Sequence, residues 1–335
     1  MASKQPVMVE VLRGPVVESV HQVLAVVANE VGAVTHYWGH PQYLTFPRSC
    51  IKMLQAIPLV ESGAAQKFEL DDKMIALACA SHSGEEFHLQ SLQQWAEKVG
   101  FKESQLICGP HWPYNEDSAR LMVRRGQEPT PFCNNCSGKH SGILTTCQHF
   151  GYDLANYQDY SHPAQKRLRD ILTETMKVDH SKAAHGVDGC GIPTYAVPLQ
   201  SIATGMSTFV NSKLAPKRKE TAERILRAVR SYPEYVSGSN DTFTVDVVSK
   251  TQGRVIVKGG AEGVFTGILV DKKITFAVKC IDGNARAARL VAATLIAQFA
   301  GLSAEESAFL KSHLNPVIKN WKGDVVGQLR IAKPS

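Results

Sequence analysis

Short apolar runs bounded by turn residues predict strands at both ends of the chain. Near the start they cover residues 7–12, 23–28 and 34–38, and a turn with Asn29 and Gly32 between the last two is typical of a hairpin. The last third has further strand-like runs at 254–258, 263–270, 274–280 and 325–331. The two chain ends are therefore predicted to build one antiparallel sheet.

Helical spacing of apolar residues dominates the middle of the chain. The stretch from Pro47 to about Gly63 has a mostly apolar face, which Pro58 is expected to kink or shorten. Further helices are predicted near 71–80, 84–100, 117–125, 143–147, 162–178 and 216–230, and after the strands at 284–300 and 303–313. The fold class is α/β, more closely α+β, with an antiparallel sheet, flanking helices and a helical subdomain.

Length and composition narrow the organisation of the protein. A chain of 335 residues, 44% of them hydrophobic, is long enough for two domains or one domain with a large insertion. We interpret residues 1–335 as a single catalytic unit. Its helical part covers about 47–230, and its sheet comes from about 7–38 and 250–331.

Charge and targeting signals exclude several function classes. No apolar run reaches the roughly 18 residues of a membrane span, and the N-terminus lacks signal-peptide features, so a soluble, cytoplasmic protein is expected. The net charge of +6 is spread out, and its densest run, 217–219, opens a helix. A solvated face is favoured there over a nucleic-acid site. Eight cysteines without a secretion signal favour free thiols or a metal site.

Ser49 and Lys52 form the one Ser-x-x-Lys pattern in the chain. Residues three apart on a helix lie on one face with Cβ atoms roughly 5–6 Å apart, so a lysine amine can reach the serine oxygen. This spacing suits a nucleophile with its own base. The alternative is a helix-capping serine beside a surface lysine.

Two later motifs extend this pattern. Ser81-His82-Ser83 ends a buried helix, and Lys258-Gly259-Gly260 ends a strand where glycines would let a substrate approach the backbone. The order Ser-x-x-Lys, Ser-x-Ser, Lys-x-Gly resembles the three motifs of serine β-lactamases and penicillin-binding proteins. Only 32 positions separate Ser49 from Ser81, and Ser83 stands where those enzymes have asparagine, which argues against a cell-wall transpeptidase. A C-cap cluster is the alternative for Ser81.

The middle of the chain also offers soft metal ligands. Cys133-x-x-Cys136 is followed at a distance by Cys190, which glycines flank, and this set could ligate zinc. A four-cysteine ribbon is not expected because no second Cys-x-x-Cys exists, and a redox pair lacks the surrounding βαβ pattern. Buried free thiols remain an alternative. His82 and His140 are more typical of hydrogen-bonded loop histidines than of ligands.

Taken together, the segments around these motifs resemble the asparaginase II family, the rhizobial-type (class 3) L-asparaginases. The segments that carry the resemblance are 48–52, 79–84, 136–140, 188–193 and 258–263, and it extends over nearly the whole chain. The resemblance implies a fold like the serine β-lactamases and penicillin-binding proteins, assembled as a homodimer. It also implies L-asparagine as the small-molecule substrate, with no nucleic-acid or membrane partner.

The resemblance further implies roles for particular residues. Ser49 would be the nucleophile with Lys52 as its base, and Ser81 with Lys258 would relay protons. Zn²⁺ near the catalytic serine would assist substrate positioning without being the hydrolytic centre. Its implied ligands are Cys136, Lys139 and Cys190, and the implied substrate-binding positions are Arg48, His82, Asn135, Asp188 and Gly259. An acidic group such as Asp188 could hold the α-ammonium group.

The function expected from the sequence is hydrolysis of L-asparagine to L-aspartate and ammonia through a serine–lysine acyl-enzyme. Two alternatives stay open. Another serine–lysine amidohydrolase, such as a glutaminase or a β-lactamase-like enzyme, would share the three motifs. A non-enzymatic zinc-binding protein would keep Cys136, Lys139 and Cys190 and would not depend on Ser49.

Overall fold

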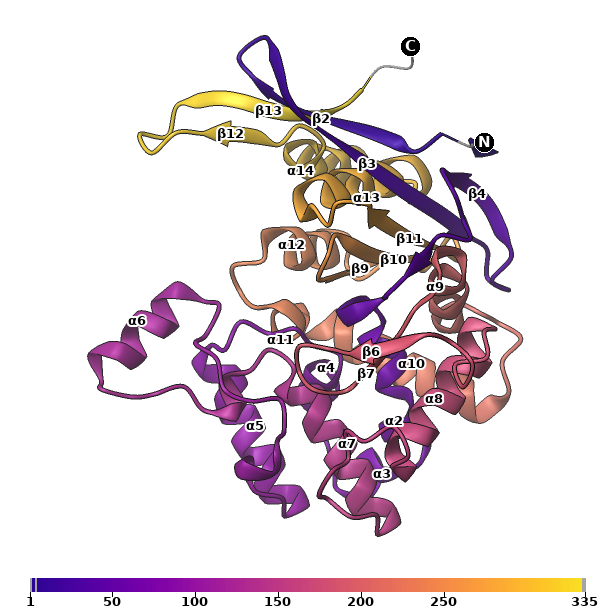
Figure 1. The fold of residues 1–335 in the computed structure, drawn as a ribbon, viewed down its shortest axis with the longest axis vertical. Coiled ribbons are helices and arrows are strands. Elements are labelled where there is room, and N and C mark those ends of the chain that lie inside the picture. The colour runs from indigo at the N-terminus through magenta and orange to yellow at the C-terminus, as the bar shows by residue number, and fades with distance from the viewer. Residues whose placement is uncertain (1, 4, 333–335) are drawn as a thin grey trace. The chain divides into compact units, whose positions relative to one another are not determined.

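The computed structural model describes residues 2–3 and 5–332, which form two compact units (Figure 1). The first unit combines Met1–Cys50, Ala196–Lys213 and Lys250–Ser335. The second combines Ile51–Tyr195 and Leu214–Ser249. Both units therefore contain segments that are far apart in the sequence. The two units do not decide whether residues 1–335 act as a single catalytic unit, so this stays a prediction.

The first unit is built on an antiparallel sheet drawn from both chain ends, as predicted. Among the described residues it has nine strands, and only β1 (Ala2–Ser3) pairs in parallel, with β4 (Val34–Trp38), which also pairs with β3. The main order is β12 (Val317–Lys319), β13 (Val325–Ile331), β2 (Val7–Arg13), β3 (Val16–Ala28), β11 (Ile274–Cys280), β10 (Val264–Leu269) and β9 (Val255–Gly260). A separate short pair joins β5 (Leu44–Thr45) to β8 (Val197–Pro198).

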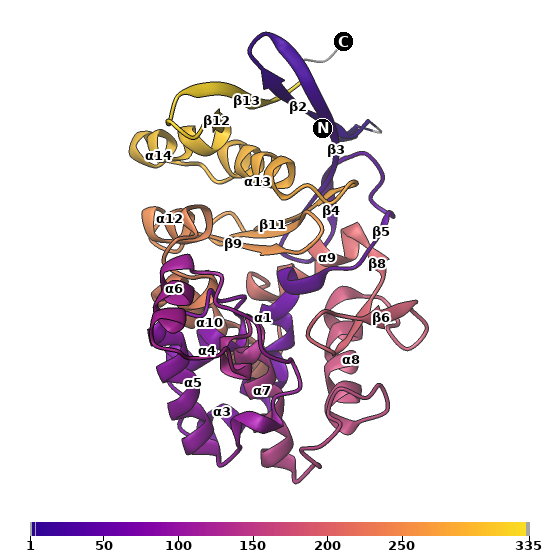
Figure 2. The same cartoon turned by 60° about the vertical axis from the view of Figure 1, so that its left-hand side comes forward.

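Helices cover both faces of this sheet, and Figures 1 and 2 place α13 (Ala285–Phe299) and α9 (Leu199–Met206) on opposite sides of β10 and β11. The Thr275 hydroxyl on β11 donates to the Ala203 carbonyl of α9 over 2.8 Å. Helix α14 (Ala304–Leu314) packs on α13. Because both faces are covered, every residue of β10 is buried, and the strand has the continuous apolar composition of a doubly covered strand.

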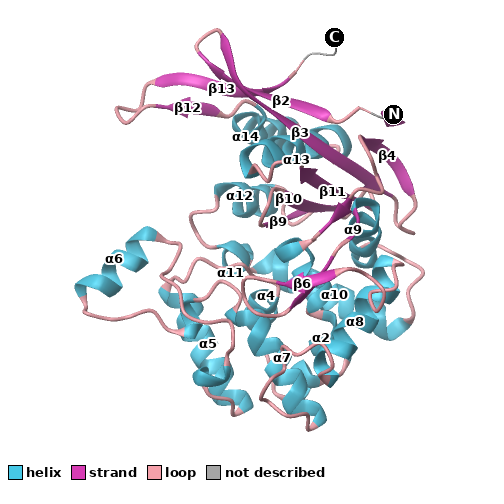
Figure 3. Cartoon of the chain, viewed as in Figure 1, coloured by secondary structure: helices cyan, strands magenta, loops and turns pink. Residues whose placement is uncertain are grey.

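The second unit is mostly helical (Figure 3). Among the described residues, its strands are β6 (His185–Val187) and β7 (Pro193–Tyr195), which pair as a hairpin. Its helices are α1 (Lys52–Gln55), α2 (Ile57–Glu61), α3 (Ala64–Lys67), α4 (Asp72–Ala78), α5 (Glu86–Val99), α6 (Glu116–Arg124), α7 (Ser137–Phe150), α8 (Pro163–Met176), α10 (Pro216–Ser231), α11 (Pro233–Ser237) and α12 (Thr242–Lys250). The α+β class with a helical subdomain is confirmed.

The helix predicted after Pro47 is broken into short pieces. A 3₁₀ turn, η1 (Arg48–Ile51), runs directly into α1, and α2 begins again after Ala56. Pro58 lies in the first turn of α2, where its missing N–H costs no helical hydrogen bond. The expected interruption by Pro58 is confirmed, and it leaves Lys52 at the start of a helix of only four residues.

Close packing of α7 on α4 fixes the inner part of the second unit. A Cβ on Gly138, in the first turn of α7, would collide with the Leu77 carbonyl of α4, so glycine permits this approach. The fully buried Trp95 of α5 donates its indole N–H to the Thr145 hydroxyl of α7 over 2.9 Å. The start of α7 is thereby held against the end of α4, where Ala80 and Ser81 follow.

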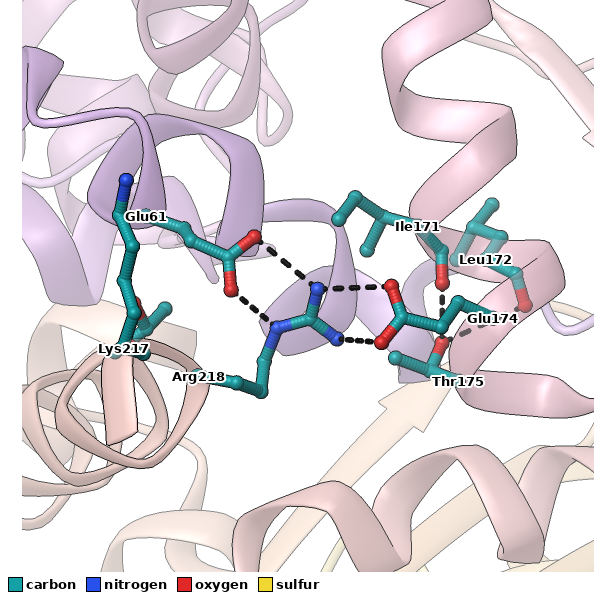
Figure 4. Close-up of polar contacts among 8 residues, drawn as sticks. Glu61, Ile171, Leu172, Glu174, Thr175, Lys217 and Arg218 are labelled. Atoms are coloured by element: carbon teal, nitrogen blue, oxygen red, sulfur yellow. Dashed lines mark hydrogen bonds and ion pairs between the residues drawn. The ribbon is translucent and has the colours of Figure 1, made fainter. Parts of the chain in front are cut away.

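An ion triad ties three helices of the same unit together (Figure 4). The guanidinium of Arg218 on α10 bonds to both carboxylate oxygens of Glu61 on α2, at 2.5 and 3.1 Å. It also bonds to both oxygens of Glu174 on α8, at 3.1 and 3.0 Å. Only 10% of the Arg218 side chain and 21% of the Glu61 side chain are exposed, so this pair is largely shielded from solvent, whereas 60% of the Glu174 side chain is exposed.

None of the helices formed by the described residues has both the length and the apolar character needed to cross a membrane. All eight cysteines, each within the described residues, are buried free thiols.

Candidate active site

Several polar groups of the second unit surround the side-chain amine of Lys52. Its side chain is 1% exposed, and its amine donates to the Ala80 carbonyl. The same Nζ lies 3.1 Å from Ser81 Oγ and 3.2 Å from Cys136 Sγ, with the Asn135 carbonyl at 3.4 Å. A buried lysine amine beside a serine hydroxyl can exchange a proton with it, which is the arrangement of an acid–base pair.

The predicted ligands Cys136, Lys139 and Cys190 lie together next to Lys52. All three side chains are buried, and Lys139 Nζ lies 2.9 Å from Cys190 Sγ. Cys136 and Lys139 come from the start of α7, whereas Cys190 lies at the turn of the β6–β7 hairpin. That turn is closed by the Gly191 N–H, which donates to the Asp188 carbonyl over 2.8 Å.

The protonation of this group reflects mutual stabilisation of opposite charges. A hydrogen bond from Cys190 holds the pKa of the Cys136 thiol well below its usual value, and the nearby lysines support this against burial. The same hydrogen bond, with burial, raises the pKa of Cys190. Burial alone would lower the pKa of Lys139, but the charges of Cys136 and Cys190 raise it, with a smaller contribution from Asp188. The pair of thiols therefore holds one negative charge between two lysines.

Two thiols and one amine facing each other form a donor set that zinc accepts. Sulfur and nitrogen donors suit its borderline-soft character, and three protein ligands would leave a fourth position open. A lysine amine binds a metal only after losing its proton, so metal and proton compete at Lys139. The residues present thus fit the expected metal.

His82 lies next to this group but is fully buried, with both ring nitrogens in hydrogen bonds. Its Nδ1 accepts from the Gly84 N–H over 3.1 Å, so its Nε2–H donates to Ser137 Oγ over 2.8 Å. Burial lowers its pKa well below the usual value, which keeps the ring neutral. In this geometry His82 holds the first turn of α7 rather than presenting a free ring nitrogen to a substrate.

His111 is a residue that the sequence analysis missed. Its Nε2 accepts from the Asn135 N–H over 2.9 Å, and its Nδ1–H donates to the Trp112 carbonyl over 2.7 Å. The half-buried Asn135 is thereby fixed by a residue 24 positions away. No periodic pattern or motif in the sequence connects these two segments.

The remaining predicted residues lie in the first unit, around η1 and the end of β9. A Cβ on Gly260 would lie 3.1 Å from the Cys50 nitrogen and 3.3 Å from the Ser49 nitrogen, so the strand end passes directly beside the candidate nucleophile. Lys258 is buried on β9, and its amine donates to the Gly259 carbonyl over 3.1 Å. Ser49 is half-buried.

The backbone before Ser49 is strained. Arg48 has φ +50°, a left-handed conformation that is uncommon for a residue with a side chain. The Thr266 hydroxyl of β10 donates to the Cys50 carbonyl over 3.0 Å, and this bond fixes the turn to the sheet. Burial raises the pKa of Cys50 to about 12, so this thiol is a packing group, and the half-buried Ser49 supplies the hydroxyl of the turn. Strain of this kind is frequent at functional sites.

The predicted site residues therefore form two groups, each within one unit. The group in the second unit consists of Lys52, Ser81, Asn135, Cys136, Lys139 and Cys190. His82 bonds to the first turn of α7, and Asp188 lies close enough to Lys139 to affect its pKa. Arg48, Ser49, Lys258 and Gly259 lie in the first.

The family described as L-asparaginase II matches residues 9–331. No curated protein matches the chain.

Three solved structures show distant similarity. A D-alanine carboxypeptidase AmpC from Burkholderia cenocepacia is 12% identical, with a TM-score of 0.38 over 87% of this chain and 92% of the other. A β-lactamase from Mycobacterium bovis is 13% identical, with a TM-score of 0.40 over 83% and 95%. A simvastatin synthase mutant from Aspergillus terreus is 10% identical, with a TM-score of 0.36 over 77% and 86%. At TM-scores below 0.5, these similarities carry no argument about this chain.

Proposed function

The chain belongs to the L-asparaginase II family, and from this premise we propose that it hydrolyses L-asparagine to L-aspartate and ammonia through a covalent ester on Ser49. Family membership supports an amidohydrolase. The observation that carries the serine–lysine mechanism is the buried amine of Lys52, 3.1 Å from Ser81 Oγ and three residues after Ser49.

In the proposed reaction, Ser49 Oγ attacks the side-chain amide carbon while Lys52, acting as a neutral amine, takes the hydroxyl proton. The tetrahedral intermediate collapses as that proton passes through Ser81 to the amide nitrogen, and ammonia leaves. Water then attacks the aspartyl ester and regenerates Ser49. Backbone N–H groups near Ser49 would stabilise the oxyanion, a contribution worth roughly 3–4 kcal/mol per donor in other acyl-transfer enzymes.

The other site residues have supporting roles in this proposal. The Asp188 carboxylate would pair with the α-ammonium group of the substrate, and the Arg48 guanidinium suits its α-carboxylate. Asn135 and the backbone at Gly259 would line the pocket. Lys258 would supply positive charge beside the leaving group, and His82 would act by positioning the start of α7, because both of its nitrogens are already bonded.

Ser81 is a rival nucleophile within the same chemistry, because it lies within hydrogen-bonding distance of Lys52. We propose Ser49 as the nucleophile because it follows the strained Arg48 in a partly accessible turn and has the Ser-x-x-Lys spacing. Ser49→Ala should abolish ester formation, whereas Ser81→Ala should slow proton transfer while an ester still forms.

We propose that Cys136, Lys139 and Cys190 hold Zn²⁺ and that the metal helps to orient the substrate. When bound, it would supply a positive charge at the edge of the pocket. Cys136→Ser is expected to remove about one equivalent of zinc and to raise KM more than it lowers kcat. Unchanged zinc content by elemental analysis would refute these ligands.

The test of the reaction is ammonia release from L-asparagine and L-glutamine by wild type, Ser49→Ala and Ser81→Ala. Activity on asparagine that disappears in Ser49→Ala supports the proposal. A stronger reaction with glutamine, or stable acylation by penicillin, would instead favour another serine–lysine amidohydrolase. Zinc binding without amidase activity on either substrate would favour a non-enzymatic zinc protein.

The assembly and location implied by the family resemblance belong to the same proposal. We propose a homodimer that acts in the cytoplasm on a small-molecule substrate. Sedimentation of the purified chain would test the dimer, and cell fractionation would test the location.

A further inference from the structure

A second group of chemically reactive side chains lies in the first unit, where strands β3 and β11 meet the start of α13. It consists of His21 on β3, Cys280 at the end of β11 and Asp282 in the following turn. None of these residues belongs to the motifs from which the proposed reaction was built.

The pairing of β3 with β11 explains why these three residues meet. Cys280 pairs with Val23, and the Ile281 N–H donates to the Gln22 carbonyl over 2.9 Å, so the pairing continues past the strand end. Side chains two residues apart point to the same face of a sheet. His21 and Asp282 therefore share the face of Cys280.

The turn that follows is held rigidly. The Gly283 N–H donates to the Cys280 carbonyl over 3.1 Å, and the Asn284 N–H donates to Asp282 Oδ1 over 3.0 Å. Asn284 in turn caps α13 with bonds to the N–H groups of Arg286 and Ala287. The carboxylate of Asp282 is thus fixed by backbone on one side, and its position does not depend on a flexible loop.

The donor atoms of the three residues lie within 4.8 Å of one another. His21 Nδ1 is 2.5 Å from Asp282 Oδ2, and Cys280 Sγ is 2.9 Å from Asp282 Oδ1. The His21 and Cys280 side chains are buried, and His21 Nε2 is buried without a hydrogen-bond partner. By contrast, 49% of the Asp282 side chain is exposed, which gives an ion a route from solvent.

We propose that His21, Cys280 and Asp282 bind a divalent transition metal ion of the zinc type, at a site distinct from Cys136, Lys139 and Cys190. Imidazole nitrogen, thiolate sulfur and carboxylate oxygen are all ligands that zinc takes. Ca²⁺ and Mg²⁺ are disfavoured because they require several oxygen ligands. On binding, Cys280 releases its thiol proton to solvent, a metal–sulfur bond forms, and water fills the fourth position.

Charges of both signs lie near the site, and Lys279 interacts electrostatically with Cys280 and Asp282. The Lys279 amine donates a hydrogen bond to the Glu262 backbone carbonyl over 2.5 Å. The carboxylate of Glu262 lies beside Gly283, where a Cβ would come 2.7 Å from Oε2, so it adds negative charge near the turn. The hydrogen bonds of these side chains within the described residues join them to one another and to the turn. A hydrogen-bonded cluster that binds no ion is therefore the alternative outcome.

Cobalt titration of the full chain tests the site, because a cysteine thiolate bound to Co²⁺ gives a charge-transfer band in the near ultraviolet. The Cys136→Ser/Cys190→Ser double variant removes the other thiolate pair. We expect it still to bind one equivalent of Co²⁺ with this band. Adding Cys280→Ser should abolish the band, and His21→Gln should weaken binding. Adding Cys147→Ser, a buried cysteine elsewhere, should leave the band intact.

Absence of a thiolate band in the double variant, or a band that persists after Cys280→Ser, would overturn the proposal. Should the double variant fail to fold, the comparison is made in the wild-type background. Cys280→Ser alone must then reduce bound Co²⁺ by one equivalent and abolish part of the rise in Tm that Zn²⁺ produces. An unchanged equivalent and an unchanged rise would contradict the site.

Discussion

At the scale of single residues, Lys52 combines deep burial with four polar neighbours. A neutral amine offers two N–H protons and one lone pair, and here the Ala80 and Asn135 carbonyls can accept while Ser81 Oγ and Cys136 Sγ lie on its other sides. Such an amine is expensive to bury without partners, so its neighbours determine both its position and its proton transfers. This is why we assign Lys52 the role of base.

Replacing this amine gives the first prediction. Lys52→Met keeps the length of the side chain and should lower kcat by about 10²–10⁴-fold, the usual contribution of a positioned base. Steady-state ammonia release measures it. Lys98→Met, at an exposed lysine bonded to the Glu69 carbonyl, is the matched control and should leave kcat within about twofold. Equal rates for Lys52→Met and wild type would contradict the assignment.

Part of the site was predictable at this scale. Spacing along one segment, or position at a helix end, predicts Ser49, Lys52 and Ser81 as candidates, and the structure places Lys52 beside Ser81. His111 and Ser137 were not found, since their roles come from contacts with segments 24 and 55 positions away. Tertiary packing creates those contacts, and no local pattern encodes them.

At the scale of elements, strong periodicity was a reliable guide and short buried segments were not. Helices α8 and α10 lie close to their predicted ranges because each has a long amphipathic face. Helix α9 was missed, because eight residues including Ser201, Thr204 and Gly205 have weak helix propensity. It is helical because it packs on β3 and β11. The β6–β7 hairpin was missed for a similar reason, since each strand has only three residues.

The Arg218 triad gives a prediction about how elements are joined. Arg218→Met should lower the free energy of unfolding by about 2–4 kcal/mol, because it leaves Glu61 unpaired in a largely buried position and disconnects α10 from α2 and α8. Urea unfolding measures this loss. Arg227→Met is the matched control on the same helix. Its partner is Asp72 and 60% of its side chain is exposed, so a loss below about 1 kcal/mol is expected. Similar losses for the two variants would show that burial of the triad has no energetic consequence.

At the scale of the whole molecule, the construction of one sheet from both chain ends was predictable. Alternating and continuous apolar runs at 7–28 and 255–280 specify strands wherever they lie in the sequence. The division into two units was not predictable in detail, because residues 196–213 return to the sheet unit from within the helical stretch. These residues belong to the sheet unit because α9 packs on β3 and β11, and such long-range packing cannot be read from a local sequence pattern.

Buried neutral histidines give the whole chain a pH dependence. Burial lowers the pKa of His82 and His140 well below the usual value and that of His88 to about 4. Unfolded histidine takes up a proton near pH 6.5. The unfolded chain therefore binds more protons between about pH 6.5 and 4, and stability falls as the pH drops through this window.

For His88 alone the expected loss is roughly 1.5 kcal/mol between pH 6.5 and 5, because the slope reaches about 1.4 kcal/mol per pH unit only below the unfolded pKa. Urea unfolding at a series of pH values should show this slope, and His88→Gln should reduce it. Constant stability over this range would show that the buried rings are not neutral in the folded protein, and an equal slope in His88→Gln would contradict the part assigned to His88.

The central claim is that Ser49 carries an aspartyl ester, and the most direct measurement is to locate that ester. Enzyme mixed with excess L-asparagine is quenched in acid within the first turnovers, digested and sequenced by mass spectrometry. Our account predicts an aspartyl adduct on Ser49 that is absent from Ser49→Ala and present in Ser81→Ala. An adduct on Ser81, or ammonia release by Ser49→Ala at the wild-type rate, would contradict it.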